Sequence, residues 1–507
     1  MRSWLITATF VTSVLSQFVS LPDIELDPQV AQAQVAGFCW SSSQAIAQKE
    51  ALLKTAVRGD QTAKNRYQEL IAQDAQRLRQ CRAQSWPQIQ AIWLRLYPCD
   101  FKPGVLDSLM DRIANRGYNR IYLEVFYNGQ VLLPAANNPT TWPTVVRNSE
   151  YAQSDLLAQA IQKGHERGLG VYAWMFSLNY GYIYGQRPDR QQVLARNGQG
   201  QTSLTIVDTR SFDVDLSNGD VDKVFIDPYN FQARQDYNQL LRAVLQRRPD
   251  GVLFDYIRYP RQSGAASIAS KVKDLWIYSD ASQQALVSRA LNNKGQVLIQ
   301  RYLRQGYISA NDLATVDKLY PTEREPLWQG RNPPSSPLNK PLPPIAWRLP
   351  LLQQDLWLLS AAHAYQGVVD FLAAAALPVQ QQNIAAGAVF FPDGNRRIGQ
   401  GFDSRMQAWD RFPSSIEWHP MSYGSCGGTS CVVDQVRRVV DQAPPGTRVS
   451  PVIAGAWGQA HGIHLPLETQ MYAIRQAAPQ INSISHFDYS WQDPQFANAR
   501  RACSVSY

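Results

Sequence analysis

The sequence predicts an α/β fold in which eight parallel strands close into a (β/α)8 TIM barrel. From about residue 90, apolar strand-like segments alternate with amphipathic helix-like segments. Parallel neighbours of this kind require right-handed crossovers, and eight such units close naturally into a barrel. A doubly wound open sheet is the alternative, but no glycine-rich phosphate loop follows any predicted strand.

The composition is that of an ordinary globular protein. Of the 507 residues, 45% are hydrophobic and 18% are charged, which excludes coiled-coil, collagen-like and largely disordered structures. Basic residues number 49 and acidic residues 41, so the net charge is +8. Because no run of Lys and Arg accompanies this mild excess, we expect no nucleic-acid partner. The sequence makes no prediction about oligomeric state.

Residues 1–33 have the features of an export signal. Arg2 precedes an apolar run over 4–21, and Ala31-Gln32-Ala33 forms a weak cleavage site. We therefore expect the protein to be exported to the periplasm, the cell envelope or the extracellular space, with no membrane span after signal removal. A retained anchor is the alternative, because the apolar run is near the lower length limit for a span.

Six cysteines fit disulfide formation in an oxidising compartment, although six allow 15 pairings. The four residues between Cys426 and Cys431, Gly-Gly-Thr-Ser, turn back easily, so this pair is the first expectation. Cys39 with Cys81 would then join two N-terminal helices and leave Cys99 for Cys503. Metal binding is the alternative, but no paired C-x-x-C or histidine spacing supports it. We expect neither a metal nor a cofactor.

The elements follow in order from a predicted helical hairpin (40–88) into the barrel (89–507). The hairpin helices are expected near 43–57 and 61–83. The barrel strands are expected at 92–97, 120–126, 170–176, 251–257, 384–391, 416–422, 449–456 and 483–489. Helices are expected after the first seven, at 105–115, 154–167, 232–247, 352–376, 402–411, 432–443 and 467–478. After the fourth strand, an insertion (262–350) of short helices and a proline-rich run would either roof the cleft or block it.

The active site of such a barrel lies at the carboxyl ends of the strands. Asp255 ends an apolar strand there, with Arg258 three residues on to keep it ionised; a rim salt bridge is the alternative. Glycoside cleavage needs two carboxyl groups, and the candidate partners are Glu417 and Asp393. Glu417 shares a strand face with His419, Met421 and Tyr423, so it either lines a cavity or is a buried hydrogen-bonded carboxylate. Asp393 lies between Pro392 and Gly394, which also suits a turn residue.

Other polar and aromatic residues near strand ends are candidates for binding a sugar. They are Glu124, Asn128, Trp174, Tyr256, Arg258, Tyr259, His419, Tyr423, Trp457, Asp488 and Trp491. Core packing is the alternative for the histidine and the tryptophans. No Ser-His-Asp order stands out at the strand ends, so acyl transfer is not expected. A deacetylase would need a metal-binding Asp/His/His set that the six scattered histidines do not form.

The segment Asp250-Gly-Val-Leu-Phe-Asp-Tyr-Ile-Arg-Tyr-Pro260 resembles the signature of the glycosyl hydrolase-like family 10 proteins, (β/α)8 glycosidases of bacterial envelopes. The resemblance covers about 90–495, outside 262–350. Segments similar to further family motifs follow one another in order: Trp93-Leu94, 119–129, 172–175, 226–228, 419–423 and 487–490. The sequence departs from the family at Tyr172, where His is frequent, and at Glu124, where Gln is common.

The resemblance implies hydrolysis of a sugar polymer, with Asp255 at the matched acidic position. We therefore expect an exported glycoside hydrolase-like protein that cleaves O-glycosidic bonds in an envelope or extracellular polysaccharide by carboxylate acid/base chemistry. The alternative is a non-catalytic carbohydrate-binding or envelope-scaffold protein on the same barrel, since the departures and the insertion bear on activity.

Overall fold

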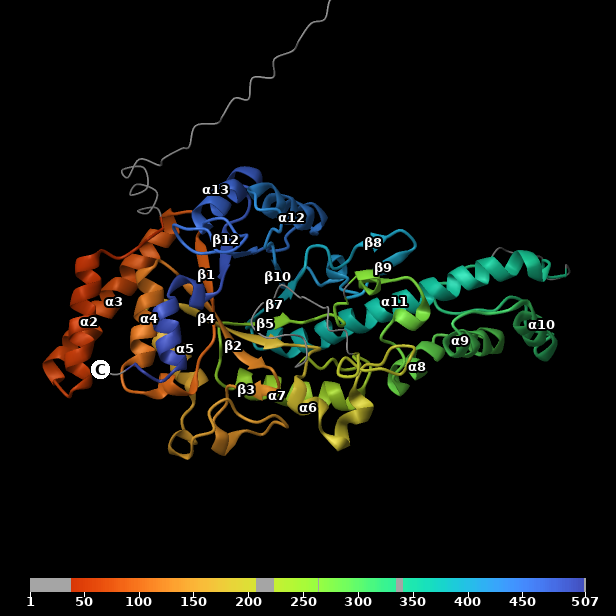
Figure 1. Cartoon of the computed structure of the whole chain (residues 1–507), viewed down its shortest axis with the longest axis horizontal. Coiled ribbons are helices and arrows are strands. Elements are labelled where there is room, and N and C mark those ends of the chain that lie inside the picture. The colour runs from red at the N-terminus through yellow and green to blue at the C-terminus, as the bar shows by residue number, and fades with distance from the viewer. Residues whose placement is uncertain (1–37, 207–222, 263, 334–340, 506–507) are drawn as a thin grey trace, which may run out of the picture.

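The computed structural model describes residues 38–206, 223–262, 264–333 and 341–505, and its centre is a nearly closed barrel of eight parallel strands (Figure 1). The strands are β1 (Ile89–Leu94), β2 (Arg120–Tyr127), β4 (Gly170–Phe176), β5 (Gly251–Asp255), β7 (Ala385–Phe390), β10 (Glu417–Pro420), β11 (Val452–Ala454) and β12 (Ser483–Phe487). Their order is β10-β7-β5-β4-β2-β1-β12-β11. Two parallel bridges, Trp418 with Val449 and Met421 with Val452, join the outer strands. The predicted barrel fold is confirmed.

The strands are apolar along most of their length because helices cover the outside and side chains fill the inside. All five residues of β5 are buried. The first strand begins at Ile89 and not at the predicted residue 92, because Ile89 pairs with Ser483 of β12. The predicted export signal lies outside the described residues.

Helices surround the sheet as a crossover topology requires (Figure 1). They are α4 (Val105–Asn115), α5 (Leu156–Glu166), α7 (Phe231–Leu245), α11 (Ile345–Gln380), α12 (Thr429–Gln442) and α13 (Leu467–Ala477). The helix predicted over 402–411 is wrong. There β9 (Gly401–Asp403) pairs antiparallel with β6 (Ile268–Ala269), and only the 3-10 turn Trp409–Arg411 is helical. The Asp403 carboxylate accepts two hydrogen bonds from Arg405, 2.7 Å each, which closes a local turn in place of a helix.

The predicted N-terminal hairpin helices are present as α2 (Ser43–Val57) and α3 (Gln61–Gln84). The hairpin lies against α4 and α5 at one end of the molecule (Figure 1). The Tyr67 hydroxyl donates to Asp111 of α4 at 2.7 Å and accepts from Arg167 at 2.6 Å. These buried contacts attach the hairpin to the barrel helices.

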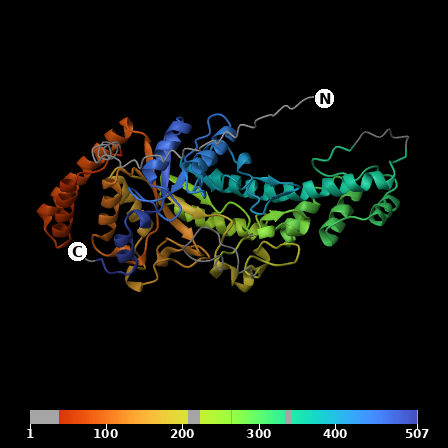
Figure 2. The ribbon, with the colours of Figure 1, turned by 45° about the horizontal axis from the view of Figure 1, so that its top comes forward.

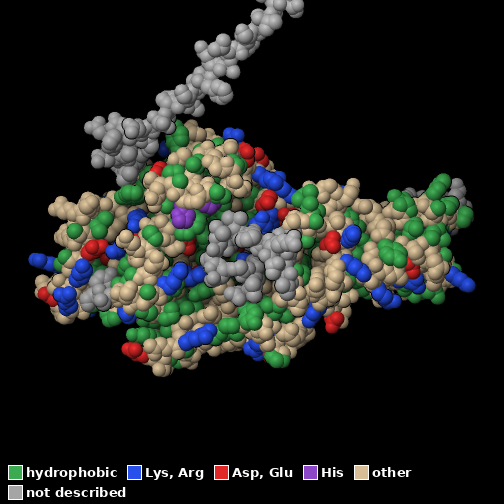
Figure 3. All heavy atoms as spheres, in the orientation of Figure 1, with side chains coloured by type: hydrophobic (Ala, Val, Ile, Leu, Met, Phe, Trp, Pro, Cys, Tyr) green, Lys and Arg blue, Asp and Glu red, His purple; other side chains and the backbone are tan. Residues whose placement is uncertain are grey.

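The insertion forms an arm that projects from the barrel on the side of the molecule opposite the hairpin (Figures 1 and 2). Its helices α8 (Asp280–Val287), α9 (Asn293–Gln305) and α10 (Ala310–Leu319) lie beside the first half of α11. Helix α11 begins at Ile345, seven residues before the predicted start, and includes Pro350. Arg348 fixes this early turn through Asp317, 2.6 Å away. Hydrophobic side chains are exposed near the free end of the arm (Figure 3).

All six cysteines are paired. The disulfides are Cys39–Cys81, Cys99–Cys503 and Cys426–Cys431, with Cα–Cα separations of 5.8, 5.3 and 6.0 Å. These are the three predicted pairings. Within the described ranges, no helix is both long enough and apolar enough to span a membrane.

Candidate active site

A cavity of about 80 Å³ opens at the carboxyl ends of the barrel strands, where the sequence places the active site. We call it the mouth pocket. Six of the predicted site residues line it: Glu124, Asn128, Trp174, Asp255, Tyr256 and Tyr423. Among the residues of 262–350 that the structure describes, none lines the mouth pocket.

Asp255 is the last residue of β5, and its side chain reaches the mouth pocket. The residue is 7% exposed. Its Oδ2 accepts a hydrogen bond from the indole Nε1 of Trp174 at 2.9 Å, and its Oδ1 accepts one from the backbone N–H of Tyr256 at 2.6 Å. Two donors therefore fix the orientation of the carboxyl group, which satisfies a first requirement for positioned acid/base chemistry.

Glu124, near the end of β2, brings a second carboxyl group to the mouth pocket. Arg95, one residue beyond β1, binds it in a bidentate pair: Nε contacts Oε2, and Nη2 donates to Oε1 at 3.0 Å. Burial alone would lower the pKa of Arg95, but the adjacent Glu124 carboxylate raises it above the ordinary value. A paired guanidinium favours the ionised form of a carboxyl group.

Aromatic rings wall the two acids. Trp174 contacts Trp93 edge to face, with ring centroids 4.8 Å apart, and the rings of Phe176 and Tyr256 lie 4.4 Å apart. Lys223 adds a cation 5.3 Å from the Tyr256 ring. Rings that flank carboxyl groups provide apolar surfaces on which sugar faces can stack, so the composition of the mouth pocket suits a carbohydrate.

The rim of the mouth pocket depends on a close backbone approach. Asn128 has a positive φ of 47°, and Gly129 follows it with φ 70°. A Cβ on Gly181 would lie 2.0 Å from the Gly129 backbone nitrogen, so only glycine fits at this position. The loops after β2 and β4 therefore hold each other in place beside Asn128.

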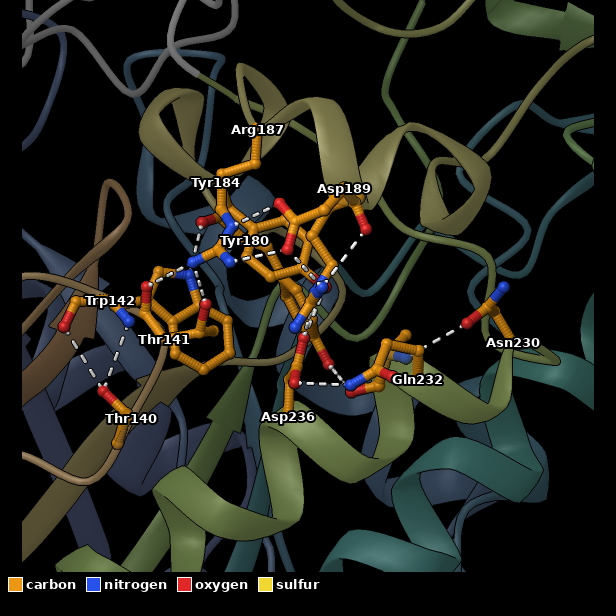
Figure 4. Close-up of polar contacts among 12 residues, drawn as sticks. Thr140, Thr141, Trp142, Tyr180, Tyr184, Arg187, Asp189, Asn230, Gln232 and Asp236 are labelled. Atoms are coloured by element: carbon orange, nitrogen blue, oxygen red, sulfur yellow. Dashed lines mark hydrogen bonds and ion pairs between the residues drawn. The ribbon is translucent and has the colours of Figure 1, made fainter.

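A polar network under these loops fixes them to helix α7 (Figure 4). The Asp236 carboxylate accepts from Tyr184 at 2.8 Å and from Gln232 at 2.8 Å. Arg187 forms two contacts with Asp189, 3.0 and 2.8 Å long, and also donates to Thr141 of the preceding loop. These contacts link the loops after β2 and β4 to each other and to α7.

Arg258 and Tyr259 lie behind the wall of the mouth pocket. The Arg258 guanidinium stacks over the Tyr256 ring at 4.8 Å and over Phe391 at 5.5 Å, and it donates to the Tyr259 carbonyl at 3.1 Å. Tyr259 is fully buried.

Asp393 does not line the mouth pocket either. Its carboxylate pairs with Arg405 at 2.9 Å. Burial opposes its ionisation, but the Arg405 charge outweighs burial and lowers the pKa of Asp393. Asp393 also lies in a turn, where its carbonyl oxygen accepts from the Arg396 N–H at 3.1 Å, as the turn-residue alternative predicts.

Glu417 and His419 lie deeper along β10, toward the opposite end of the barrel. The Glu417 carboxylate lies 3.3 Å from His419 Nε2 and accepts from the Tyr172 hydroxyl at 3.3 Å. Burial would raise the pKa of Glu417, but the His419 hydrogen bond and two nearby arginines lower it to about 2. Burial lowers the pKa of His419. The structure does not bring Glu417 together with Asp255 in one pocket.

The last three candidates lie around the mouth pocket without lining it. Trp457 donates to the Tyr118 hydroxyl at 3.0 Å, and Trp491 stacks on His461 with centroids 4.1 Å apart. Asp488 caps a short helix by accepting from Ser490 at 2.9 Å. Burial raises the pKa of Asp488.

Several lining residues were not predicted as site residues. They are Trp93, Arg95, Phe176, Lys223, Val389, Met421 and Phe487. Arg95 had a visible signal, since it is the first charged residue after the apolar segment 91–94. Within the described ranges, no group of three or more potential metal-ligating side chains occurs.

One family model matches part of the chain. The family model described as glycosyl hydrolase-like 10 matches residues 88–297, which confirms the predicted family over that region. No curated protein matches.

Solved structures with some likeness include three proteins at low identity. A hypothetical protein from Ruminiclostridium thermocellum ATCC 27405 has 15% identity, 33% of this chain and 77% of that chain covered, and TM-score 0.24. The galactosidase domain of an alpha-galactosidase-sucrose kinase is 10% identical, and the match covers 86% of this chain and 43% of that chain with a TM-score of 0.37. A GH18 chitinase from Pseudoalteromonas aurantia is 9% identical, and the match covers 82% of this chain and 99% of that chain with a TM-score of 0.33.

Proposed function

From the glycosyl hydrolase-like 10 match over residues 88–297, we propose that the protein is a glycoside hydrolase whose chemistry takes place in the mouth pocket. The observation that carries the proposal is that the mouth pocket holds two carboxyl groups, Asp255 and Glu124, between aromatic walls. Glycoside cleavage uses one carboxyl group to protonate the leaving oxygen and a second to attack the anomeric carbon or to activate water.

We assign different roles to the two acids. Glu124 is bound by Arg95, so it is the carboxylate that stays charged and attacks or deprotonates water. Proton transfer to the leaving oxygen then falls to Asp255, whose carboxyl group is oriented by Trp174 and by the Tyr256 backbone. Glu417 and Asp393 act outside the reaction in this proposal, because their ion-pair partners hold them elsewhere.

The test uses two aspartates of the same strand region. Asp250 precedes β5, accepts from Val171 N–H at 2.6 Å and lies at the opposite end of the strand from Asp255. Asp255→Asn should reduce hydrolysis at least about a hundredfold, on the scale of general acid–base contributions. Asp250→Asn should leave hydrolysis unchanged. The measurement is reducing-end release from envelope glycans and from 4-nitrophenyl glycosides.

The role assignment has its own readout. A glycoside with a good leaving group needs little protonation, so Asp255→Asn should recover activity on 4-nitrophenyl substrates more than on glycans. Glu124→Gln should not recover on either substrate unless azide replaces the missing carboxylate. Absence of turnover by the unaltered protein, together with glycan binding, would favour the carbohydrate-binding alternative.

Export to the envelope or the extracellular space is also part of the proposal. Three disulfides that pair every cysteine support it, since such pairing is typical of oxidising compartments. Cell fractionation of the full chain, with the mass of the mature N-terminus, tests it: cleavage near Ala33 is expected, and an uncleaved cytoplasmic protein would contradict it.

A further inference from the structure

A second cavity lies at the opposite end of the barrel, and we call it the basal pocket. Its volume is about 350 Å³, within the range of roughly 300–1,000 Å³ that small-molecule sites occupy. It is lined by the first residues of β1, β2, β10 and β12 and by the segments that precede β11 and β12. In barrel enzymes this end normally serves stability, so an open pocket there needs an explanation.

The basal pocket carries two arginines and one carboxylate. Arg120 Nη1 lies 3.8 Å from Glu417 Oε2, and Arg448 Nη1 lies 3.3 Å from Glu417 Oε1. Glu417 is ionised at neutral pH because its pKa is lowered to about 2, and burial keeps His419 uncharged by lowering its pKa. The local sum is therefore one positive charge.

Glu417 does not saturate the two guanidinium groups. A close guanidinium–carboxylate pair has N···O distances of about 2.7–2.9 Å, and both contacts here are longer. The Arg120 guanidinium also lies 4.4 Å over the Tyr172 ring, which fixes its plane. A stacked guanidinium keeps its N–H edge available for an oxyanion, while Arg448, 68% exposed, stands at the entrance.

The rest of the lining adds hydroxyl groups and apolar surface. Ser450 and Ser483 face each other with their Oγ atoms 2.7 Å apart, and the Asn482 side chain lies at the exposed rim. Ile89 and Val449 provide apolar wall. An occupant that fits this lining has one anionic group, hydroxyl groups and some apolar surface.

We propose that the basal pocket binds a small hydroxylated organic anion, a sugar carboxylate or a sugar phosphate, with its anionic group between Arg120 and Arg448 and a hydroxyl group at Ser450 and Ser483. The proposal does not depend on hydrolysis in the mouth pocket. Carboxylate and phosphate share the chemistry that two guanidinium groups recognise, and separate titrations distinguish them.

The test is calorimetric titration of the intact protein with glucuronate, with glucose 6-phosphate and with glucose. Saturable binding of at least one anion below about 10 mM is expected, whereas glucose should bind at least about tenfold more weakly, because a hydrogen bond to a charged group is lost. Arg448→Gln should weaken anion binding at least about tenfold for the same reason. The matched control is Arg66→Gln, an exposed arginine on α3.

A second variant tests the cavity itself. Asn482→Trp enters from the exposed rim and fills the basal pocket, so it should abolish anion binding while unfolding remains cooperative. Absence of binding by both anions would overturn the proposal. Equal weakening in Arg66→Gln and Arg448→Gln would also overturn it, because the attraction would then come from the net charge of the chain.

Discussion

The two ends of the barrel each hold a buried glutamate beside arginine, yet the two pockets are chemically different. At the mouth, Glu124 is bound by Arg95 and shares its pocket with Asp255 and aromatic rings. At the base, Glu417 lies between two arginines in a pocket about four times larger, 350 against 80 Å³, and it is the one carboxylate among the described lining residues. Cavity volume alone would place the active site at the base. The paired acids at the strand ends place it instead at the mouth.

One strand serves both ends. In β4, the Tyr172 hydroxyl donates to Glu417 of the basal pocket, and Trp174, two residues on, donates to Asp255 of the mouth pocket. Residues two apart on a strand share a face, so these side chains point into the same barrel interior at different depths. Variants at the two depths therefore separate chemistry from stability.

The largest effect is expected at Glu124. Glu124→Gln removes the negative charge that the proposed mechanism needs, so turnover should fall at least about a hundredfold. Glu166→Gln, at the end of α5, provides a matched control outside the mouth pocket. The measurement is kcat on the best glycan, with thermal unfolding to show that the variant is folded. Near-normal turnover in folded Glu124→Gln would remove Glu124 from the mechanism.

Glu417→Gln should act on stability. The folded-state pKa of Glu417, about 2, lies below its ordinary value of 4.5. Ionised Glu417 therefore stabilises the fold fully above about pH 5, and this contribution is lost as the pH falls toward 2; a shift of this size corresponds to about 3 kcal/mol. Glu417→Gln should lower the free energy of unfolding at pH 7 by roughly that amount. Urea unfolding from pH 2 to 7 should also show a flatter pH dependence in the variant, and an unchanged slope would contradict the assignment.

Trp174→Phe should affect the mouth pocket more mildly. The variant keeps a ring against Trp93 but removes the indole donor to Asp255, so turnover should fall about tenfold, as for one hydrogen bond to a charged group. Trp418→Phe is the control, because its indole donates to the Pro413 carbonyl, away from the mouth pocket. Equal losses of turnover in both variants would indicate a packing effect.

The smallest effect is expected for Tyr172→Phe. It removes a 3.3 Å hydrogen bond to Glu417, which already has ionic partners, so the free energy of unfolding should fall by about 1 kcal/mol or less. Turnover should not change. A large loss of turnover would show that the two ends are coupled through β4.

The sequence by itself determined the barrel, the Cys426–Cys431 pair and the position of Asp255. These follow from local patterns: the alternation of strands and helices, the spacing of cysteines, and an apolar strand that ends in an acid. The helix predicted over 402–411 failed because pairing with Ile268–Ala269, far away in the sequence, decides that segment.

Only the tertiary structure decided which acids share a pocket. Backbone pairing links Glu417, Gly387, Leu253, Trp174 and Glu124 in one row across neighbouring strands. Glu124 nevertheless lines the mouth pocket and Glu417 the basal pocket. The physical reason is the tilt of barrel strands relative to the barrel axis, because a row of paired residues then climbs along that axis. The depth of a side chain depends on that stagger, which no single strand sequence contains.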